Sequence, residues 1–465
     1  MERRDGVRRW LRGTGLAVLL GGVPLQACDR VLEVTDPDII LEANSAGAAL
    51  AIANGAIFRL TQAMSGIEGA DNLFMFGGLL ADEWRSGDTF VQRNNQDQRI
   101  FQPDNTFNDD LYLAVNRPRV QAEAAIRALR TFTPDSTRLI GLMFAVMAYV
   151  ETAVGEHYCN GHPLSGLDEG GQIVTGAPIT NDSIFRRAVA HADSAIAQAA
   201  GAEGASVRSF ASIVKGRALV DLGQYAAAAA AVAGIPKTFK WSLEHSITTV
   251  DNEIWGLNND PKRYTMVDRE GGNGLDFISA NDPRLPNVTG PDRIFDSALP
   301  LLVTRQGIYG QESDVPIATG LEARLIIAEA LFNAGDRTAW LDTLNALRTD
   351  TTLYPPIEGG QAVANQPPFV RGPRLAAIAD TFADDRSRIY THFRERAFWM
   401  FSTGHRLGDM RRMIRQYGSL GFAPDNVFPV GPYFKGGSFG SAVNMPVPFE
   451  ETNNPNFTQC IDVNP

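Results

Sequence analysis

The chain has 465 residues, of which 44% are apolar, and a formal net charge of −11. This length and apolar content allow a large buried core and exclude a disordered chain. The negative charge argues against duplex nucleic acid and anionic membrane surfaces as partners, because both are bound through concentrated lysine and arginine. We therefore expect a folded, acidic protein without a nucleic-acid ligand.

The N-terminal residues form an export signal. Five arginines between positions 3 and 12 precede an apolar segment, Gly13 to Leu25, that is too short to cross a bilayer as a mature helix. The segment ends in Leu25-Gln26-Ala27-Cys28, which resembles the bacterial lipobox, where the cysteine is diacylated and becomes the first mature residue. We predict a signal peptide over 1–27, lipidation at Cys28 and a tether over 28–38, with membrane contact through the lipid alone. The alternative is an ordinary signal peptide followed by a chance cysteine.

Export bears on the two other cysteines, Cys159 and Cys460. They are an even pair in a compartment that is oxidising, where cysteines form disulfides. We therefore predict a disulfide between them, tying the C-terminal tail to a central loop.

Apolar residues recur at steps of three to four along most of the chain, which indicates amphipathic helices. Two pairs of these helices are joined by a glycine and a polar residue, Gly223-Gln224 and Gly335-Asp336, and the first turn resembles that of a tetratricopeptide repeat. Such units bury their faces against neighbouring units, so we predict a curved stack of helix pairs. The predicted helices lie within 36–64, 110–129, 136–158, 181–200, 210–222, 225–233, 322–334, 338–348 and 386–404.

Three long stretches, 237–316, 353–373 and 421–465, lack this periodicity and are rich in proline, glycine and asparagine. Residues 90–99 form a further polar loop. Loops this long are usually functional or disordered. The first of the three stretches holds the aromatic residues Trp241, Trp255, Tyr264, Phe277, Phe295 and Tyr309.

The last predicted helix and the charges after it, Arg386 to Arg412, form a cluster in which buried salt bridges are expected. The cluster contains, in order, Glu395-Arg396, Gly404-His405-Arg406 and Asp409 to Arg412. This order resembles the C-terminal helix of the RagB/SusD family of surface nutrient-binding lipoproteins. Two positions that are usually acidic in the family are Trp399 and Thr403 here, and an aromatic pair is replaced by Leu407-Gly408. Asn281 to Arg284, the lipobox and the proline-rich end add shorter matches in the family's order.

The resemblance implies a mainly α fold: a scaffold of tetratricopeptide-like helix pairs over about 40–235 and 318–418, an irregular ligand-side region over about 237–316, and an extended segment over 421–465. Residues 39–465 would be a single SusD-like domain, anchored in the outer membrane at the cell surface. The implied function is binding of an oligomeric nutrient, a glycan or else a peptide. The protein would act as the lid of a TonB-dependent, SusC-like β-barrel transporter, so that binding and gating proceed without bond cleavage.

Binding of sugars or peptides needs aromatic platforms and planar hydrogen-bonding groups. In the family, the loop after the first helices and part of the irregular region contribute to the ligand face. The ligand-binding candidates are therefore Trp84, Asp82, Arg85, Arg93, Asn94, Trp255, Tyr264 and Tyr309. The competing interpretation is that each aromatic residue anchors its loop to the core.

The sequence lacks the common catalytic motifs: it has no P-loop, no dinucleotide-binding glycine motif, no nucleophile elbow and no HExxH. Adjacent acids such as Asp82-Glu83 do not face one substrate, and His157 and His162 in one loop are weak evidence for zinc. We expect no enzyme, catalytic residue, metal or cofactor. The rival functions are a lipid-anchored repeat scaffold for envelope proteins and a hydrolase built on helices.

Overall fold

The computed structural model describes residues 43–67, 71–168, 170, 172–360 and 366–465. The predicted signal peptide, Cys28 and the tether lie outside these residues. The described residues belong to one compact unit. Its main helices are α1 (Ala46–Met64), α4 (Thr106–Phe132), α5 (Thr137–His157), α6 (Asn181–Gln198), α7 (Ala205–Asp221), α8 (Tyr225–Val232), α10 (Gly320–Asn333), α11 (Arg337–Arg348), α12 (Asp385–Trp399) and α13 (Arg406–Tyr417).

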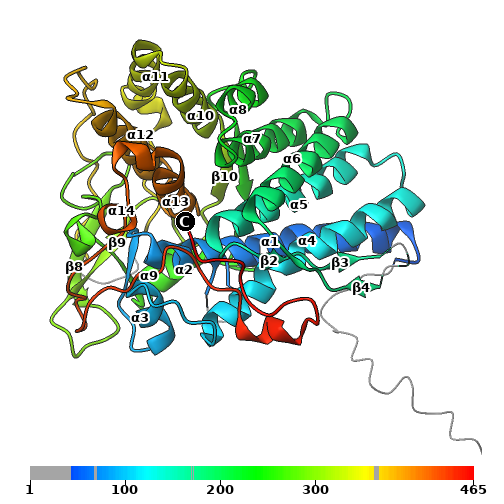
Figure 1. Cartoon of the computed structure of the whole chain (residues 1–465), viewed down its shortest axis with the longest axis horizontal. Coiled ribbons are helices and arrows are strands. Elements are labelled where there is room, and N and C mark those ends of the chain that lie inside the picture. The colour runs from blue at the N-terminus through cyan, green and yellow to red at the C-terminus, as the bar shows by residue number, and fades with distance from the viewer. Residues whose placement is uncertain (1–42, 68–70, 169, 171, 361–365) are drawn as a thin grey trace, which may run out of the picture. The chain divides into compact units, whose positions relative to one another are not determined.

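The first eight of these helices form a stack in which each packs against the next, from α1 on α4 to α10 on α11 (Figure 1). The mainly α fold built from helix pairs is thus confirmed. Both predicted turns are present, because Gly223 and Gly335 have φ angles of +69° and +89°, a left-handed conformation in which glycine carries no steric cost. A Cβ on Gly216 in α7 would lie 2.6 Å from Val232 of α8, so a glycine here permits the close approach of that pair.

Helix α5 is long and apolar enough to cross a membrane by composition, but 89% of its apolar window is buried inside the protein. It packs against α4, α6 and α7 at the centre of the stack. Its hydrophobicity is therefore explained by its position in the core.

The irregular half consists of short elements. The helices are α2 (Leu73–Leu80), α3 (Val91–Asp97), α9 (Glu253–Asn259) and α14 (Pro424–Val427), with 3-10 turns at Glu270–Gly272, Thr351–Leu353, Gly418–Leu420 and Phe449–Asn453. The strands pair antiparallel in twos: β1 (Trp84–Ser86) with β7 (Tyr264–Met266), β2 (His162–Pro163) with β5 (Pro178–Ile179), β3 (Gly166–Leu167) with β4 (Ile173–Val174), β6 (Lys240–Leu243) with β10 (Val315–Thr319), and β8 (Asn287–Arg293) with β9 (Leu302–Gln306). The prediction of a loop over residues 90–99 is wrong in part, because α3 lies within this stretch.

The predicted salt-bridge cluster is present in the core. Arg396 donates to Asp409 at 2.8 Å, and Arg412 binds Asp409 at 2.9 Å and Glu329 of α10 at 2.6 Å, with all four side chains buried. These bonds join α12 and α13 to the helical stack.

Two of the sequence motifs meet directly. Arg284, of the segment Asn281 to Arg284, donates to Asp282 at 2.7 Å and to Glu395 of α12 at 2.6 Å, and its side chain is fully buried. The irregular half is thereby joined to the C-terminal helix through a charge-assisted bidentate contact.

The C-terminal helix ends earlier than predicted. α12 stops at Trp399, because Met400 leaves helical geometry and Ser402 adopts a φ of +57°. Gly404, at φ +73°, therefore shapes the turn between α12 and α13 and does not cap a longer helix. Residues 400–405 become a loop that faces a cavity.

The C-terminal tail is tied down by Cys460, which forms a disulfide with Cys159 after α5, with a Cα–Cα distance of 6.1 Å. A bridge between Tyr158 and Met445 lies beside it.

Candidate functional site

Most of the predicted ligand-binding residues form one cluster, but inside the protein. Trp84 is 0% exposed; its indole N–H donates to Ser402 Oγ at 3.0 Å, and its ring packs edge-on against Tyr264. Arg93 is also buried and donates to Asp71 at 2.9 Å. Such side chains offer no surface to a ligand, so the prediction of Trp84, Arg93 and Tyr264 as ligand contacts is contradicted by their burial. The aromatic residues act here as core anchors.

The other candidates near Trp84 are occupied by internal partners. Asp82 is buried and accepts from Arg406 at 3.0 Å, which contradicts its expected role at a ligand face. Arg85 is partly buried and donates to Glu270 at 2.8 Å, while the side-chain oxygen Oδ1 of Asn94 accepts from the Ser86 hydroxyl at 2.7 Å. A polar loop sequence of this kind can therefore be a buried network as well as a binding surface.

The remaining two candidates lie elsewhere. The indole of Trp255 is half-buried and donates to the backbone carbonyl of Gly359 at 2.8 Å. Tyr309 is almost fully buried and lines the cavity described next. Of the eight candidates, Tyr309 alone is among the residues that line this cavity.

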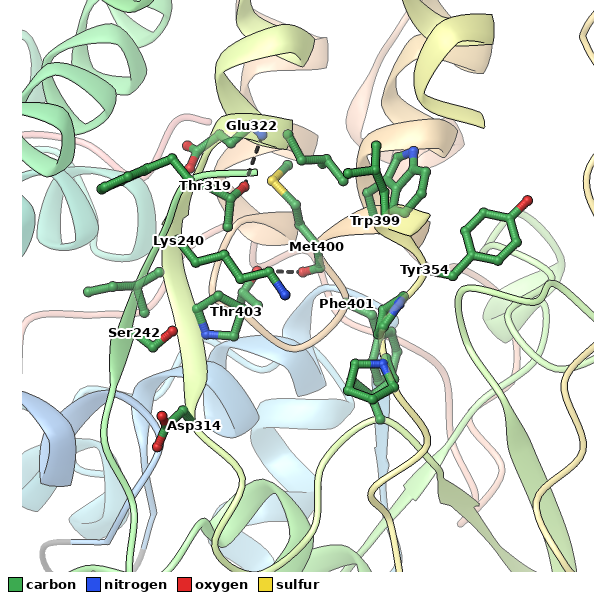
Figure 2. Close-up of a pocket in the computed structure, with 18 of the residues that line it drawn as sticks. Lys240, Ser242, Asp314, Thr319, Glu322, Tyr354, Trp399, Met400, Phe401 and Thr403 are labelled. Carbon is green, nitrogen blue, oxygen red and sulfur yellow. Dashed lines mark hydrogen bonds between the residues drawn. The ribbon is translucent and has the colours of Figure 1, made fainter. Parts of the chain in front are cut away.

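The cavity has a volume of about 320 Å³ and lies between the irregular half and the start of α10. Strands β6 and β10 form one wall, residues 352–356 with Glu358 form the opposite wall, and the turn after α12 forms the floor (Figure 2). Its volume falls at the lower end of the roughly 300–1,000 Å³ typical of small-ligand pockets. The described part of the chain therefore contains a pocket of ligand size outside the predicted cluster.

Aromatic side chains line much of this cavity. The rings of Tyr354 and Trp399 lie 5.9 Å apart at 49°, and Tyr354 is half-buried. The other aromatic residues of the lining are Phe239, Tyr309 and Phe401. Apolar rings in a concave wall are surfaces on which the faces of a sugar or another planar group can pack.

The floor holds a buried polar unit of Thr403, His405 and Glu322. The Thr403 hydroxyl donates to the carbonyl of Met400 at 2.6 Å, so it accepts from Nδ1 of His405 at 2.8 Å. The other ring nitrogen of His405 lies 3.1 Å from the Glu322 carboxylate, and that contact requires a proton between the two groups. His405 and Glu322 are thus hydrogen-bond partners in the floor of the cavity.

Two lysines line the mouth of the cavity, although the sequence has only five. Lys237 pairs with Asp350 at 2.5 Å. Lys240, on β6, extends across the cavity (Figure 2), and within the described residues it has no ion pair. The acids at the rim, Asp314 and Glu358, are exposed. Asp314 accepts from the backbone N–H of His245 at 3.2 Å, and Glu358 accepts from the Ser313 hydroxyl at 2.5 Å.

Sequence features could have located part of this cavity. Trp399 and Thr403, the two positions that depart from the family's acidic residues, both line it. The concentration of scarce lysines at 237 and 240 was a second signal. Tyr354 gave no signal, because it lies in a loop whose position depends on the tertiary fold.

Metal-binding clusters of three or more histidine, cysteine or acidic residues do not occur in the described ranges. His157 and His162 are both buried, and burial lowers the pKa of His157 to about 4 and that of His162 to about 3. The imidazole of His157 contacts the carbonyl of Ala153 at 2.8 Å, and that of His162 contacts Asn116 at 3.3 Å. Both histidines thus have structural partners.

Comparison with known proteins gave matches at the level of structure. No family model and no curated protein sequence matches the chain. A SusD superfamily protein from Parabacteroides distasonis has a TM-score of 0.63 at 12% identity, covering 90% of this chain and 99% of its own. A SusD/RagB family protein from Bacteroides thetaiotaomicron has a TM-score of 0.62 at 15% identity, covering 86% of this chain and 94% of its own.

A third match is described as a SusD-like carbohydrate-binding protein, from Bacteroides fragilis, with a TM-score of 0.62 at 14% identity, covering 89% of this chain and 99% of its own. The TM-scores establish the fold, whereas identities this low leave the identity of the ligand open. The chain therefore has the fold of the SusD/RagB family.

Proposed function

We propose that the protein is a cell-surface lipoprotein that binds an oligomeric nutrient, a glycan, in the cavity beside Trp399. The observation that carries the proposal is a ligand-sized cavity lined by aromatic side chains in a SusD-like fold. Supporting it, one structure of the same fold is described as a carbohydrate-binding protein. Glycans are bound by stacking on such rings and by hydrogen bonds from polar neighbours, here Ser242 and Thr319.

The protein would deliver its ligand and not cleave it. It would work as the lid of a TonB-dependent, SusC-like transporter, attached to the outer membrane through lipid on Cys28. Two observations support this role: the lipobox-like sequence before Cys28 and the long irregular half, which a pure repeat scaffold does not need.

Calorimetry on Tyr354 variants tests the binding site. Tyr354→Ala removes a half-buried ring from the cavity wall, and we expect the affinity for the cognate glycan to fall by about tenfold or more, which corresponds to about 1.4 kcal/mol. Tyr354→Phe keeps the ring and should retain most of the affinity. Phe449→Ala, at an aromatic residue 63% exposed in the C-terminal segment, is the matched control. Equal affinity of the Tyr354→Ala variant and the native protein would remove the cavity from the proposal.

Purification of the lipidated protein from outer membranes in mild detergent tests the partner. A large TonB-dependent β-barrel at equal stoichiometry is the expected result. Recovery of a set of envelope proteins without a barrel would favour the repeat scaffold. Glycans incubated with the purified protein should remain intact, and their cleavage would favour a hydrolase.

A further inference from the structure

A second, more open hollow of about 310 Å³ adjoins the cavity. It is lined by Thr351, Tyr354, Arg371, Gly372 and Arg374, and Tyr354 belongs to the lining of both spaces. A chain-like ligand that extends past Tyr354 would therefore meet the lining of both spaces.

The hollow is basic. Arg371 donates to the backbone carbonyls of Pro283 and Pro355, which hold its guanidinium in place without neutralising it. Arg374 is exposed. No carboxylate lies at ion-pair distance from either arginine in the ranges that the structure describes, and no acid lines the hollow.

The cavity presents a third cation. The side chain of Lys240 reaches into it, and the acid of the floor, Glu322, is already matched by His405 at 3.1 Å (Figure 2). The exposed rim acids, Asp314 and Glu358, each accept a hydrogen bond from a neutral group, so the excess of cations over acids along the path lies in the hollow. Cations therefore face both ends of the path that passes Tyr354.

A neutral sugar in this path would desolvate these cations without supplying an opposite charge, which is unfavourable. A carboxylate or sulfate would form charge-assisted hydrogen bonds with them, and the arginine fork suits both groups. The protein as a whole has a net charge of −11, so an anion is attracted only where cations are gathered locally.

We propose that the glycan bound in this path is an acidic oligosaccharide, whose rings pack on Tyr354 and Trp399 and whose acid groups bind Lys240 and Arg374. The inference rests on the proposed glycan-binding function and specifies its substrate class.

Titration calorimetry with matched pairs of ligands tests the inference. The probes are tetrasaccharides of galacturonate, mannuronate and glucuronate, each beside its neutral methyl ester, and a chondroitin sulfate tetrasaccharide beside its desulfated form, together with neutral tetrasaccharides. We expect at least one acid to bind tenfold or more tightly than the matched form from which the acid group under test has been removed or masked, and its affinity to fall as salt rises. The uronate and sulfate arms identify which acid group is recognised.

Variants assign the effect to the cations. Arg374→Gln and Lys240→Gln should each weaken the preferred acid by fivefold or more, whereas neutral tetrasaccharides should bind these variants as tightly as the native protein or more tightly. Arg186→Gln removes the same charge from an exposed position on α6 and should change nothing. Binding of neutral glycans as tightly as acids, or an acid preference that both variants retain, overturns the inference and leaves the proposed function intact. Failure of every glycan to bind overturns both.

Discussion

Asp409 is the residue whose loss the structure allows us to evaluate in most detail. It is buried on α13 and accepts from Arg396 at 2.8 Å and from Arg412 at 2.9 Å. Arg412 also binds Glu329, whereas Asp409 is the acid that pairs with Arg396 among the described residues. Asp409→Asn keeps the shape of the side chain but leaves the Arg396 guanidinium buried without a counter-charge.

Breaking a buried ion pair by removing one partner costs about 3–5 kcal/mol, and we expect a loss of this size in the free energy of unfolding at pH 7. The loss is measured as a fall in the midpoint of urea unfolding at constant slope. Asp182→Asn is the control, because Asp182 forms an exposed pair with Arg186 at 3.4 Å, and loss of such a pair costs about 1 kcal/mol or less.

The pH dependence of the stability difference between the native protein and the Asp409→Asn variant gives a second test. Burial on its own raises the pKa of Asp409, but Arg396 and Arg412 lower it from 3.8 to about 2 in the folded protein. A depressed folded pKa contributes stability that is present above the unfolded pKa and is lost as the pH falls through the folded one. The gap between the native protein and the Asp409→Asn variant should therefore narrow by about 2 kcal/mol between pH 5 and pH 2. A loss below about 1 kcal/mol at pH 7, or a gap that does not change with pH, would refute this account of the cluster.

Three further predictions concern two buried side chains and the disulfide. Trp84→Ala should lower the free energy of unfolding by about 3–5 kcal/mol in urea titrations and leave glycan affinity unchanged, since Trp84 is a fully buried core side chain. Weaker glycan binding without a loss of stability would instead show that Trp84 is a ligand-binding residue. Burial raises the pKa of Glu83 to about 8, so the folded state loses stability as the pH rises from the unfolded value of 4.5 through 8. The urea midpoint of Glu83→Gln should therefore fall less than that of the native protein between pH 6 and pH 9, and equal falls would contradict this assignment. Replacing Cys159 and Cys460 by serine opens a link across 301 residues and should cost about 2–5 kcal/mol by calorimetry, whereas an unchanged melting temperature would show that the link is dispensable.

Local patterns were sufficient for the helical part of the fold. Apolar spacing located the helices of the stack, and glycines 223 and 335 marked the turns, because helix periodicity and left-handed turns depend on neighbours in sequence. The end of α12 could not be read in this way. Met400 and Phe401 continue the apolar stripe, yet they leave the helix, since Ser402 binds the indole of Trp84, a residue 318 positions away.

The site shows the same division more strongly. An aromatic residue in a polar loop has the same local sequence whether it faces solvent or the core. The sequence by itself therefore determined that Trp84 belonged to a polar cluster. It could not determine whether that cluster is exposed or buried. Only the tertiary structure decided that Trp84 is enclosed by Tyr264 and Phe401, while Tyr354 and Lys240 face an open cavity. The physical reason is that a cavity is formed between elements distant in sequence, here β6, the loop after α11 and the end of α12, and burial results from their packing together.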